Sequence, residues 1–333
     1  MILAGDIGGT STRLGLFEWV GGQLRIVAEH TRPSRNYPGL EHIVAEFITG
    51  LRIDIQRACF GIAGPVLNGV VRTPNLPWLV DSRNLASVLA LDRVTLLNDL
   101  EANAYGIDRL APDQTVTLNA GDSDAVGNIA VISAGTGLGE AGLFWDGREH
   151  HPFACEGGHA DFAPGNELEM ELLIYLRGIF GHVSWERVLS GPGLHNIYNF
   201  LQATRPSHES SPITDDLRCA DPAMVISQAA LAGRCARCAD ALEIFVSLYG
   251  AAAGNLALKM MACGGLYLGG GIAPKIIKQL VGPGFMRAFV AKGRMQPLME
   301  SIPVRVLMND RVALWGAAQF ATRSASKAMS YPV

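Results

Sequence analysis

Three short glycine-rich segments each follow an apolar stretch of the sequence. They read DIGGTST from Asp6, SAGTGLG from Ser133 and LGGGIAP from Leu268. Glycine lets a ligand approach the main chain, so that successive N–H groups can converge on an anion, and neighbouring Thr or Ser hydroxyls add donors. One such segment alone is typical of a tight hairpin, but three of them, each after a strand, favour phosphate binding.

Two common phosphate-binding motifs are excluded. A P-loop needs two glycines four residues apart followed by Lys and then Ser or Thr, and the sequence has no such segment. A dinucleotide-binding fingerprint needs its glycines to open a helix. Because GTGLGEAGLF leads into a strand-like run instead, the sequence argues against that fold as well.

Two further segments carry groups for acid–base chemistry and for recognition of hydroxyls. LLNDLEANA places Asn98 and Asp99 where a strand stops and a helix begins. Asn or Asp there is ordinarily a helix N-cap, but a carboxylate can also accept the proton of a substrate hydroxyl during phosphoryl transfer. In CEGGHADFAPG, Glu156 and His159 bracket two glycines, which suits neighbouring sugar hydroxyls, since carboxylate accepts and imidazole donates or accepts. Metal binding is a second interpretation of this pair.

The cysteines do not indicate a zinc site or a disulfide scaffold. The CARC segment, from Cys235 to Cys238, has no partner pair at zinc spacing, so its thiols are expected to be structural. His182 is expected to be packed or to cap a helix. Six cysteines in 333 residues fit a reducing compartment, and no secretory leader is expected before the first strand. We therefore expect a cytoplasmic protein.

Composition excludes several classes of partner. Hydrophobic residues make up 49% of the chain, which is enough to build the cores of two domains or of one large one. The net charge is −4. Its acids and bases are interspersed, so no basic field would hold a nucleic acid or an anionic membrane surface. The longest apolar stretch, FVSLYGAAAGNLALKMMACGGLYLGGGIA, is interrupted by Gly, Asn and Lys, and no transmembrane segment is expected.

The order of elements predicts an α/β protein. ILAGDIGG, TRLGLFEW and QLRIVAEHTR predict a strand meander. GLEHIVAEFITGL then places Leu40, Ile43, Val44, Phe47 and Leu51 on one helix face. Strands are predicted in RACFGIAGPV and VTLLNDL, with a helix in SRNLASVLAL between them. Strands that alternate with helices favour a sheet with ligands at the strand ends.

The second half of the chain weakly repeats the opening. In NIAVISAGTGLGEAGLFWDG a strand reaches a Gly-Thr turn and a second strand follows, and residues 142–144 repeat the Gly-Leu-Phe of residues 15–17. Residues 167–200 are expected to be helical and ATRPSHESSPITDDLRCADP to be a surface loop. A long helix should bury Leu242, Phe245, Val246 and Tyr249. IPVRVLMND predicts a strand and VALWGAAQFATR a last helix.

Together these segments identify a family resemblance. DIGGTSTRLGLF, LLNDLEA, SAGTGLG, EGGHADFAP, GHVSWERVLSGPGL and LGGGIAP occur in the order seen in bacterial glucokinases, and the chain resembles them from the first strand to about residue 320. The resemblance implies the actin-like ATPase (ribonuclease H-like) fold of hexokinase-type sugar kinases, with two α/β domains around a cleft. It implies a small domain at 1–110 completed by a helix at about 311–324, a large domain at 111–310 and a disordered tail at 325–333.

The same resemblance implies ATP and Mg²⁺ as cofactors. Asp6 would face the Mg²⁺ through water, the first two glycine turns would hold phosphates, and the third would lie on the adenosine side. The cofactor-binding residues implied in this way are Asp6, Gly8, Gly9, Thr10, Gly135, Thr136, Gly137, Gly269, Gly270 and Gly271. The cysteine-rich zinc motif of a related sugar-kinase group is missing, so no other metal is expected.

On the sugar side the resemblance implies phosphorylation of D-glucose at the 6-hydroxyl, with Asp99 as general base. The implied substrate-binding residues are Asn75, Asn98, Asp99, Glu156, His159 and Glu186. Ser11 departs from the family pattern, since many relatives carry Asn there, although the turn itself should remain intact. A homodimer is common in the family.

Two alternative functions remain at this point. A kinase of mannose, fructose or an N-acetylhexosamine would share every phosphate-side feature and differ only in its hydroxyl contacts. A sugar-responsive transcriptional regulator would need a DNA-binding domain, and we expect neither a helix-turn-helix before the first strand nor a basic patch.

Overall fold

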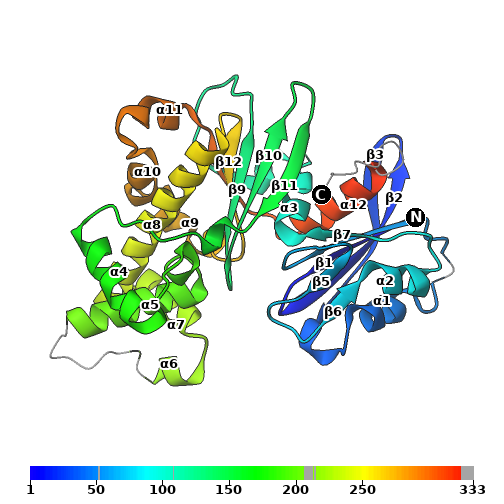
Figure 1. Cartoon of the computed structure of the whole chain (residues 1–333), viewed down its shortest axis with the longest axis horizontal. Helices are drawn as coiled ribbons and strands as arrows, with labels where there is room; N and C mark the ends of the chain where they lie inside the picture. The colour runs from blue at the N-terminus through cyan, green and yellow to red at the C-terminus, as the bar shows by residue number, and fades with distance from the viewer. Residues whose placement is uncertain (52, 108, 206–212, 214, 324–333) are drawn as a thin grey trace. The chain divides into compact units, whose positions relative to one another are not determined.

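The chain folds into two units, each built on a β-sheet with helices packed on it (Figure 1). This computed structural model describes residues 1–51, 53–107, 109–205, 213 and 215–323. Unit 1 comprises Met1–Pro112 and Asn309–Val333, and unit 2 comprises Asp113–Met308. That the units work as the small and large domains implied by the family resemblance stays a prediction. The predicted tail at 325–333 lies outside the described residues.

Unit 1 contains a five-stranded sheet in the order β3-β2-β1-β4-β7. The predicted meander is confirmed, because β1 pairs antiparallel with β2 and β2 with β3. β1, β4 and β7 are parallel, so their carboxyl ends meet at one edge of the sheet. The strands are β1 (Ile2–Ile7), β2 (Ser11–Val20), β3 (Gln23–Pro33), β4 (Arg57–Ile62) and β7 (Thr95–Asn98), and β5 (Val70–Arg72) and β6 (Leu79–Asp81) form a separate hairpin.

Helices cover both faces of this sheet, because alternate residues of a strand point to opposite sides. Leu3 and Ile7 of β1 join a core with α1 (Leu40–Ile48) and α2 (Ser82–Leu89), whereas Ile2 and Ala4 join a core with α3 (Asp99–Ile107) and α12 (Val312–Arg323). The predicted apolar face of α1 is wrong at one position. Leu51 lies beyond the end of the helix and is 39% exposed.

The contact between α3 and α12 depends on two glycines. A Cβ added at Gly316 would overlap the Ala102 carbonyl oxygen, and one added at Gly106 would overlap that of Val312. The two backbones therefore approach more closely than any side chain allows.

Gly316→Ala should destabilise unit 1 by about 3 kcal/mol, because the added methyl group must push two helices apart. Gly178→Ala is the control. Gly178 lies in α4 (Glu167–Phe180) with nothing within 4 Å of the added Cβ, so alanine there should be neutral or stabilising by up to about 1 kcal/mol. Thermal unfolding of both variants checks this, and an unchanged midpoint for Gly316→Ala would contradict the packing argument.

Unit 2 contains a six-stranded sheet in the order β11-β10-β9-β12-β13-β8. β9, β12 and β13 are parallel to one another, while β8, β10 and β11 pair antiparallel with their neighbours. The strands are β8 (Thr115–Asn119), β9 (Ile129–Ala134), β10 (Leu138–Trp145), β11 (His150–Cys155), β12 (Gly265–Gly269) and β13 (Val304–Leu307). The glycine turns after β9 and β12 therefore lie at the same edge of this sheet.

The helices of unit 2 follow the predicted regions with one interruption. Residues 167–200 are not helical throughout, because Gly181 has a φ of 72° after α4 and Ser190 caps the next helix. The predicted surface loop contains α6, and its residues 206–212 and 214 lie outside the described residues. The α-helices are α4, α5 (Gly191–Thr204), α6 (Asp216–Cys219), α7 (Pro222–Leu231), α8 (Ala236–Met260), α9 (Ile277–Val281), α10 (Pro283–Val290) and α11 (Gln296–Ser301). Short 3-10 turns also occur. In the first part of the chain they are η1 (Ser34–Asn36) and η2 (Pro112–Gln114), and in unit 2 they are η3 (Gly157–His159), η4 (Trp185–Arg187), η5 (Ala273–Ile276) and η6 (Gly293–Met295).

Helix α8 is the central helix of unit 2. The predicted buried face is confirmed, since Leu242, Phe245, Val246 and Tyr249 lie in the core. In the part of the chain that the structure describes, α8 is also the one helix long and apolar enough to cross a membrane, with a mean hydropathy of 1.4. However, 67% of that window is buried inside the structure. Its apolar residues are therefore accounted for by packing in the core of unit 2.

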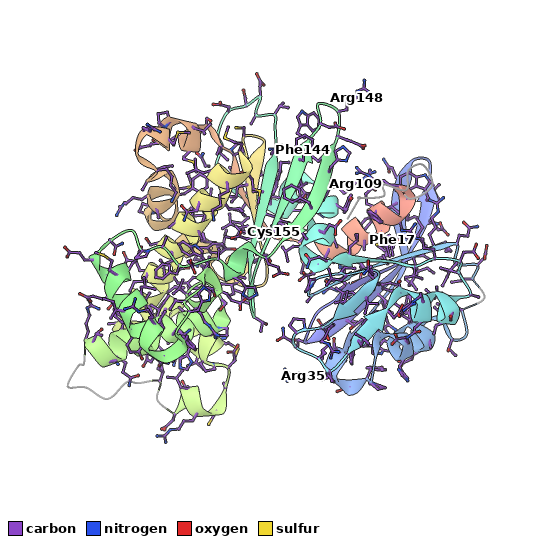
Figure 2. All side chains as sticks on the ribbon, in the orientation of Figure 1. Phe17, Arg35, Arg109, Phe144, Arg148 and Cys155 are labelled. Carbon is purple, nitrogen blue, oxygen red and sulfur yellow. The ribbon has the colours of Figure 1, made fainter. Side chains whose placement is uncertain are left out.

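The internal repeat holds for strand pairing but not for burial. β2 pairs antiparallel with β1, and β10 pairs in the same way with β9. Phe17 and Phe144, both labelled in Figure 2, occupy matching places in these two hairpins. Phe17 is fully buried beneath α12, whereas Phe144 is 54% exposed. The two hairpins thus share a backbone pattern and have different surroundings.

Candidate functional site

The first glycine turn connects β1 to β2 and is held from inside unit 1. The Gly8 N–H donates to the Ser11 carbonyl oxygen at 2.9 Å, and the Ser34 hydroxyl donates to the Gly8 carbonyl oxygen at 2.8 Å. The buried Thr12 and Ser34 hydroxyls lie 3.0 Å apart. Because Ser11 holds the turn through its carbonyl oxygen, the family's usual Asn is not needed for this bond.

Asn75 lies beside this turn. A Cβ added at Gly9 would come 2.8 Å from the Asn75 Cβ. Position 9 is therefore glycine because the exposed Asn75 side chain lies against it. Thr10 is exposed at the tip of the same turn. The structure therefore brings Asn75 together with Gly9, and its predicted place near the substrate stays a prediction.

Two carboxyl groups interact at the strand ends of unit 1. Loss of solvation raises the pKa of Asp6 to about 7, the negative charge of Asp99 adds to that increase, and Arg13 opposes it. Arg13 is the cross-strand partner of Asp6 and bonds Asp310 at 2.7 Å. A divalent cation prefers oxygen ligands and would relieve the repulsion between the two carboxylates, so this donor set fits the predicted Mg²⁺.

Asn98 is the N-cap of α3. Its Oδ1 accepts from the Leu100 N–H at 2.9 Å and the Glu101 N–H at 3.4 Å, while the Glu101 carboxylate accepts from the Asn98 backbone N–H. This reciprocal pattern is a capping box. The Asn98 Nδ2 donates to the Gly64 carbonyl oxygen at 3.2 Å, which joins the end of β7 to the segment after β4.

Asp99 occupies the first position of α3. Its Oδ1 accepts from the Leu100 N–H at 3.0 Å, and its carbonyl oxygen accepts from the Asn103 side chain at 3.0 Å. The start of a helix favours negative charge. Asp99 therefore lies in the first turn of α3 with its carboxyl close enough to Asp6 for the two charges to interact.

Glu101 generates a pH prediction. Burial raises the pKa of its carboxyl from the ordinary 4.5 to about 7, although the bond from Asn98 opposes this. The folded state therefore holds this proton more tightly than the unfolded state. The stability that the protonated Glu101 contributes is fully present below pH 4.5 and is lost as the pH rises through about 7.

Glu101→Gln should make stability less dependent on pH, because glutamine keeps the acceptor and cannot ionise. Between pH 5 and pH 8, the loss in free energy of unfolding should be smaller than in the parent by roughly 1–3 kcal/mol. Urea unfolding at both pH values checks this, with Glu167→Gln, an exposed first-turn acid of α4, as control. Equal losses in parent and Glu101→Gln would contradict the assignment.

The second glycine turn follows β9 and is supported by Glu186. The Gly135 N–H donates to the Gly137 carbonyl oxygen at 2.9 Å, and the Leu138 N–H donates to the Glu186 Oε2 at 2.9 Å. A Cβ added at Gly137 would come 2.6 Å from the same Oε2. Thr136 is exposed between the two glycines. Glu186, predicted as a sugar ligand, thus also holds a predicted phosphate turn.

The third glycine turn lies against the second. Gly269 is the strand partner of Ser133. Gly270 has a φ of 80°, and a Cβ added there would overlap the Ala134 carbonyl oxygen. Gly271 has open space around it. Unit 2 therefore carries two adjacent turns with accessible backbone at one edge of its sheet.

Glu156 directly precedes the turn η3 and His159 is its last residue, and both side chains are largely exposed. Their Oε2 and Nε2 atoms lie 3.8 Å apart, with exposed side-chain fractions of 59% and 60%. The Trp185 N–H donates to the Ala160 carbonyl oxygen at 3.0 Å, which joins this segment to the turn that carries Glu186. Unit 2 thus brings together all three of its predicted sugar ligands.

The remaining candidates have structural explanations. The prediction that His182 is packed or caps a helix is wrong, because its ring is exposed and its Nε2 lies 2.7 Å from Asp161 Oδ1. The structural assignment of CARC is confirmed, since both thiols are buried and the Cys235 Sγ accepts from the Cys238 N–H at the start of α8. Among the described residues, one cluster of possible metal ligands, Asp146, Glu149 and His151, lies on the β10–β11 hairpin.

Comparison with known proteins gives a consistent result over nearly the full length. A family profile described as Glucokinase matches residues 3–324. A glucokinase of Nostoc sp. is 42% identical over 339 residues, which cover 97% of this chain and 99% of that protein. The crystal structure of a glucokinase from an Antarctic psychrotroph matches with a TM-score of 0.83 at 34% identity, covering 96% and 98% of the two chains.

A more distant structure confirms the fold class. A ROK family glucokinase from Streptomyces griseus, solved with glucose and AMPPNP, matches with a TM-score of 0.67 at 21% identity and covers 97% of this chain and 99% of that one. The predicted actin-like fold of the sugar kinases is therefore confirmed.

Proposed function

This chain belongs to the glucokinase family and is an ATP:D-glucose 6-phosphotransferase, and we propose that Asp99 is its general base. The observation that carries the proposal is the position of Asp99 at the start of α3. There the helix start favours negative charge, the Oδ1 of Asp99 accepts from the Leu100 N–H, and Asp6, the proposed Mg²⁺ ligand, lies close enough for the two charges to interact. An ionised carboxylate can accept the proton that the substrate hydroxyl must lose.

The reaction follows from these roles. The 6-oxygen of glucose forms a bond to the γ-phosphorus of ATP, the bond from that phosphorus to the β–γ bridging oxygen breaks, and ADP leaves. The hydroxyl proton passes to the Asp99 carboxylate. Gly8, Gly9 and Thr10 supply main-chain and hydroxyl donors for the phosphates.

The nucleotide would also use unit 2. Gly135, Thr136 and Gly137 provide a second set of donors for phosphates, and the turn at 269–271 would lie on the adenosine side. Asp6 would hold Mg²⁺ through water, and when bound the ion would supply positive charge to the phosphates. The supporting observation is the pair of interacting carboxyls at Asp6 and Asp99.

The proposed sugar ligands divide by chemistry. Glu156 and His159 are exposed and close together, so they can bond neighbouring hydroxyls. The Oε2 of Glu186 accepts from Leu138, which leaves its Oε1 for a sugar hydroxyl. Asn98 uses its Oδ1 in the cap and one amide hydrogen on Gly64, which leaves one hydrogen to donate. Asn75 would act from beside Gly9.

Asp99→Asn should lower kcat by about 100- to 10,000-fold, since the amide cannot accept the proton, while glucose binding is retained. Steady-state kinetics and equilibrium glucose binding measure the two effects separately. Glu101→Gln is the matched control, because it removes a neighbouring carboxyl from the same helix and should keep kcat within about twofold. A normal kcat for Asp99→Asn would exclude Asp99 as the base.

A sugar panel tests the substrate assignment. ADP production with Mg-ATP should be fast with glucose and slow with mannose, fructose, N-acetylglucosamine or no sugar. Turnover with only another hexose would be consistent with the roles proposed for the phosphate turns and Asp99 but would overturn the assignment of the sugar ligands. The full-length relatives named as glucokinases favour glucose over the other hexoses and over a regulator. A cytoplasmic location, a homodimer and the absence of nucleic-acid and membrane partners stay predictions.

A further inference from the structure

A buried acid lies beneath the turn that carries two of the proposed sugar ligands. Glu140 is in β10 and is only 7% exposed. It is the strand partner of Ile132, which belongs to the core of unit 2, and of Cys155, labelled in Figure 2 at the end of β11. Within the described part of the chain, its carboxyl has no hydrogen-bond partner. Removing most of a carboxyl group from water without giving it a hydrogen bond costs stability, so the presence of Glu140 here calls for a role.

The Glu140 carboxyl lies directly against the first glycine of η3. A Cβ added at Gly157 would overlap the Glu140 Oε2 and would come 2.8 Å from its Cδ. The next glycine, Gly158, faces backbone instead, because a Cβ there would overlap the Leu138 carbonyl oxygen. Two β10 residues, Leu138 and Glu140, therefore define the path of the turn between Glu156 and His159, Glu140 through its side chain and Leu138 through its main chain.

Burial of the Glu140 carboxyl works against its ionised form. Burial raises the pKa of this carboxyl, and the positive charge of Lys259 only partly opposes the shift. The carboxyl of Glu140 in turn helps to raise the pKa of Cys155. A neutral carboxylic acid and the amide of glutamine have nearly the same shape, so glutamine should replace glutamate here and alanine should not.

We propose that Glu140 is a positioning residue for the sugar site: its carboxyl supports Gly157 from below and so sets the separation of Glu156 and His159. This inference rests on the proposed function, in which Glu156 and His159 bind glucose. Glu140 need not touch the sugar itself. Its removal should therefore weaken glucose binding and leave the nucleotide turns, which are held by other groups, largely unaffected.

Kinetics of single variants test the role first. Glu140→Ala should raise the KM for glucose about tenfold while the KM for ATP changes less than about twofold, and Glu140→Gln should stay close to the parent. A purely structural loss would lower the active fraction and would not separate the two KM values. Equal effects of Glu140→Ala on both KM values, or none on the KM for glucose, would overturn the proposal.

A double-variant cycle tests the contact itself. Gly157→Ala should raise the KM for glucose, because its Cβ displaces the Glu140 carboxyl, and adding Glu140→Ala should lower that KM again. Gly158→Ala is the matched control, since its clash with backbone cannot be relieved by Glu140→Ala. If Gly157→Ala does not fold, the comparison of Glu140→Ala with Glu140→Gln still decides. If adding Glu140→Ala changes the KM for glucose equally in the Gly157→Ala and Gly158→Ala variants, the proposed contact between Glu140 and Gly157 is wrong.

Two further variants separate this inference from its premise. Glu156→Gln and His159→Asn should each raise the KM for glucose if these residues bind the sugar. If they do and Glu140→Ala does not, the positioning role alone is wrong. If none of the three raises that KM, the proposed sugar site is wrong, and the inference falls with it.

Discussion

Parallel strand pairing is the constraint on which the site in each unit depends. In unit 1 the parallel strands β1, β4 and β7 place Asp6, the segment at Gly64 and Asn98 at one edge of the sheet. In unit 2 the parallel pair β9 and β12 places two glycine turns at one edge. Strand partners such as Ser133 and Gly269, 136 positions apart in the sequence, thereby become neighbours. The chemistry is carried by the turns, but their proximity is a property of the sheets.

Once the turns are gathered, close packing decides which of their residues must be glycine. At Gly9 the neighbour is the Asn75 side chain, at Gly137 the Glu186 carboxylate and at Gly270 the Ala134 carbonyl oxygen. Gly135 and Gly271, by contrast, have open space around them. The glycines in one motif therefore serve two purposes. Some allow protein to approach protein, and others keep the backbone accessible to a ligand.

The sequence predicted most of the elements and the local groups because both leave short-range patterns. The meander, the buried face of α8 and the strand ends at Asn98 were predictable from periodicity and turn residues. A helix N-cap at Asn98 or Asp99 was also predicted, whereas the part of Glu101 in a capping box was not. The placement of Leu51 on the helix face was wrong, because its spacing continues the helical period although α1 ends at Ile48. The bonds between Ser34 and Gly8 and between Glu186 and Leu138 were not predictable, since no pattern links residues 26 and 48 positions apart.

Acidic residues illustrate why a residue type alone does not define a role. Asp99 lies at a helix start that favours its charge, Glu186 accepts from a backbone N–H, and Glu101 completes a cap while burial raises the pKa of its carboxyl. Glu140 is buried without a hydrogen bond among the described residues. Of these four, Asp99 combines a helix start that favours negative charge with a close neighbour, Asp6, that would hold Mg²⁺. Because a base for phosphoryl transfer must be ionised before the substrate hydroxyl can give up its proton, that combination favours Asp99 as the base over the acids that serve a cap or a turn within their own unit.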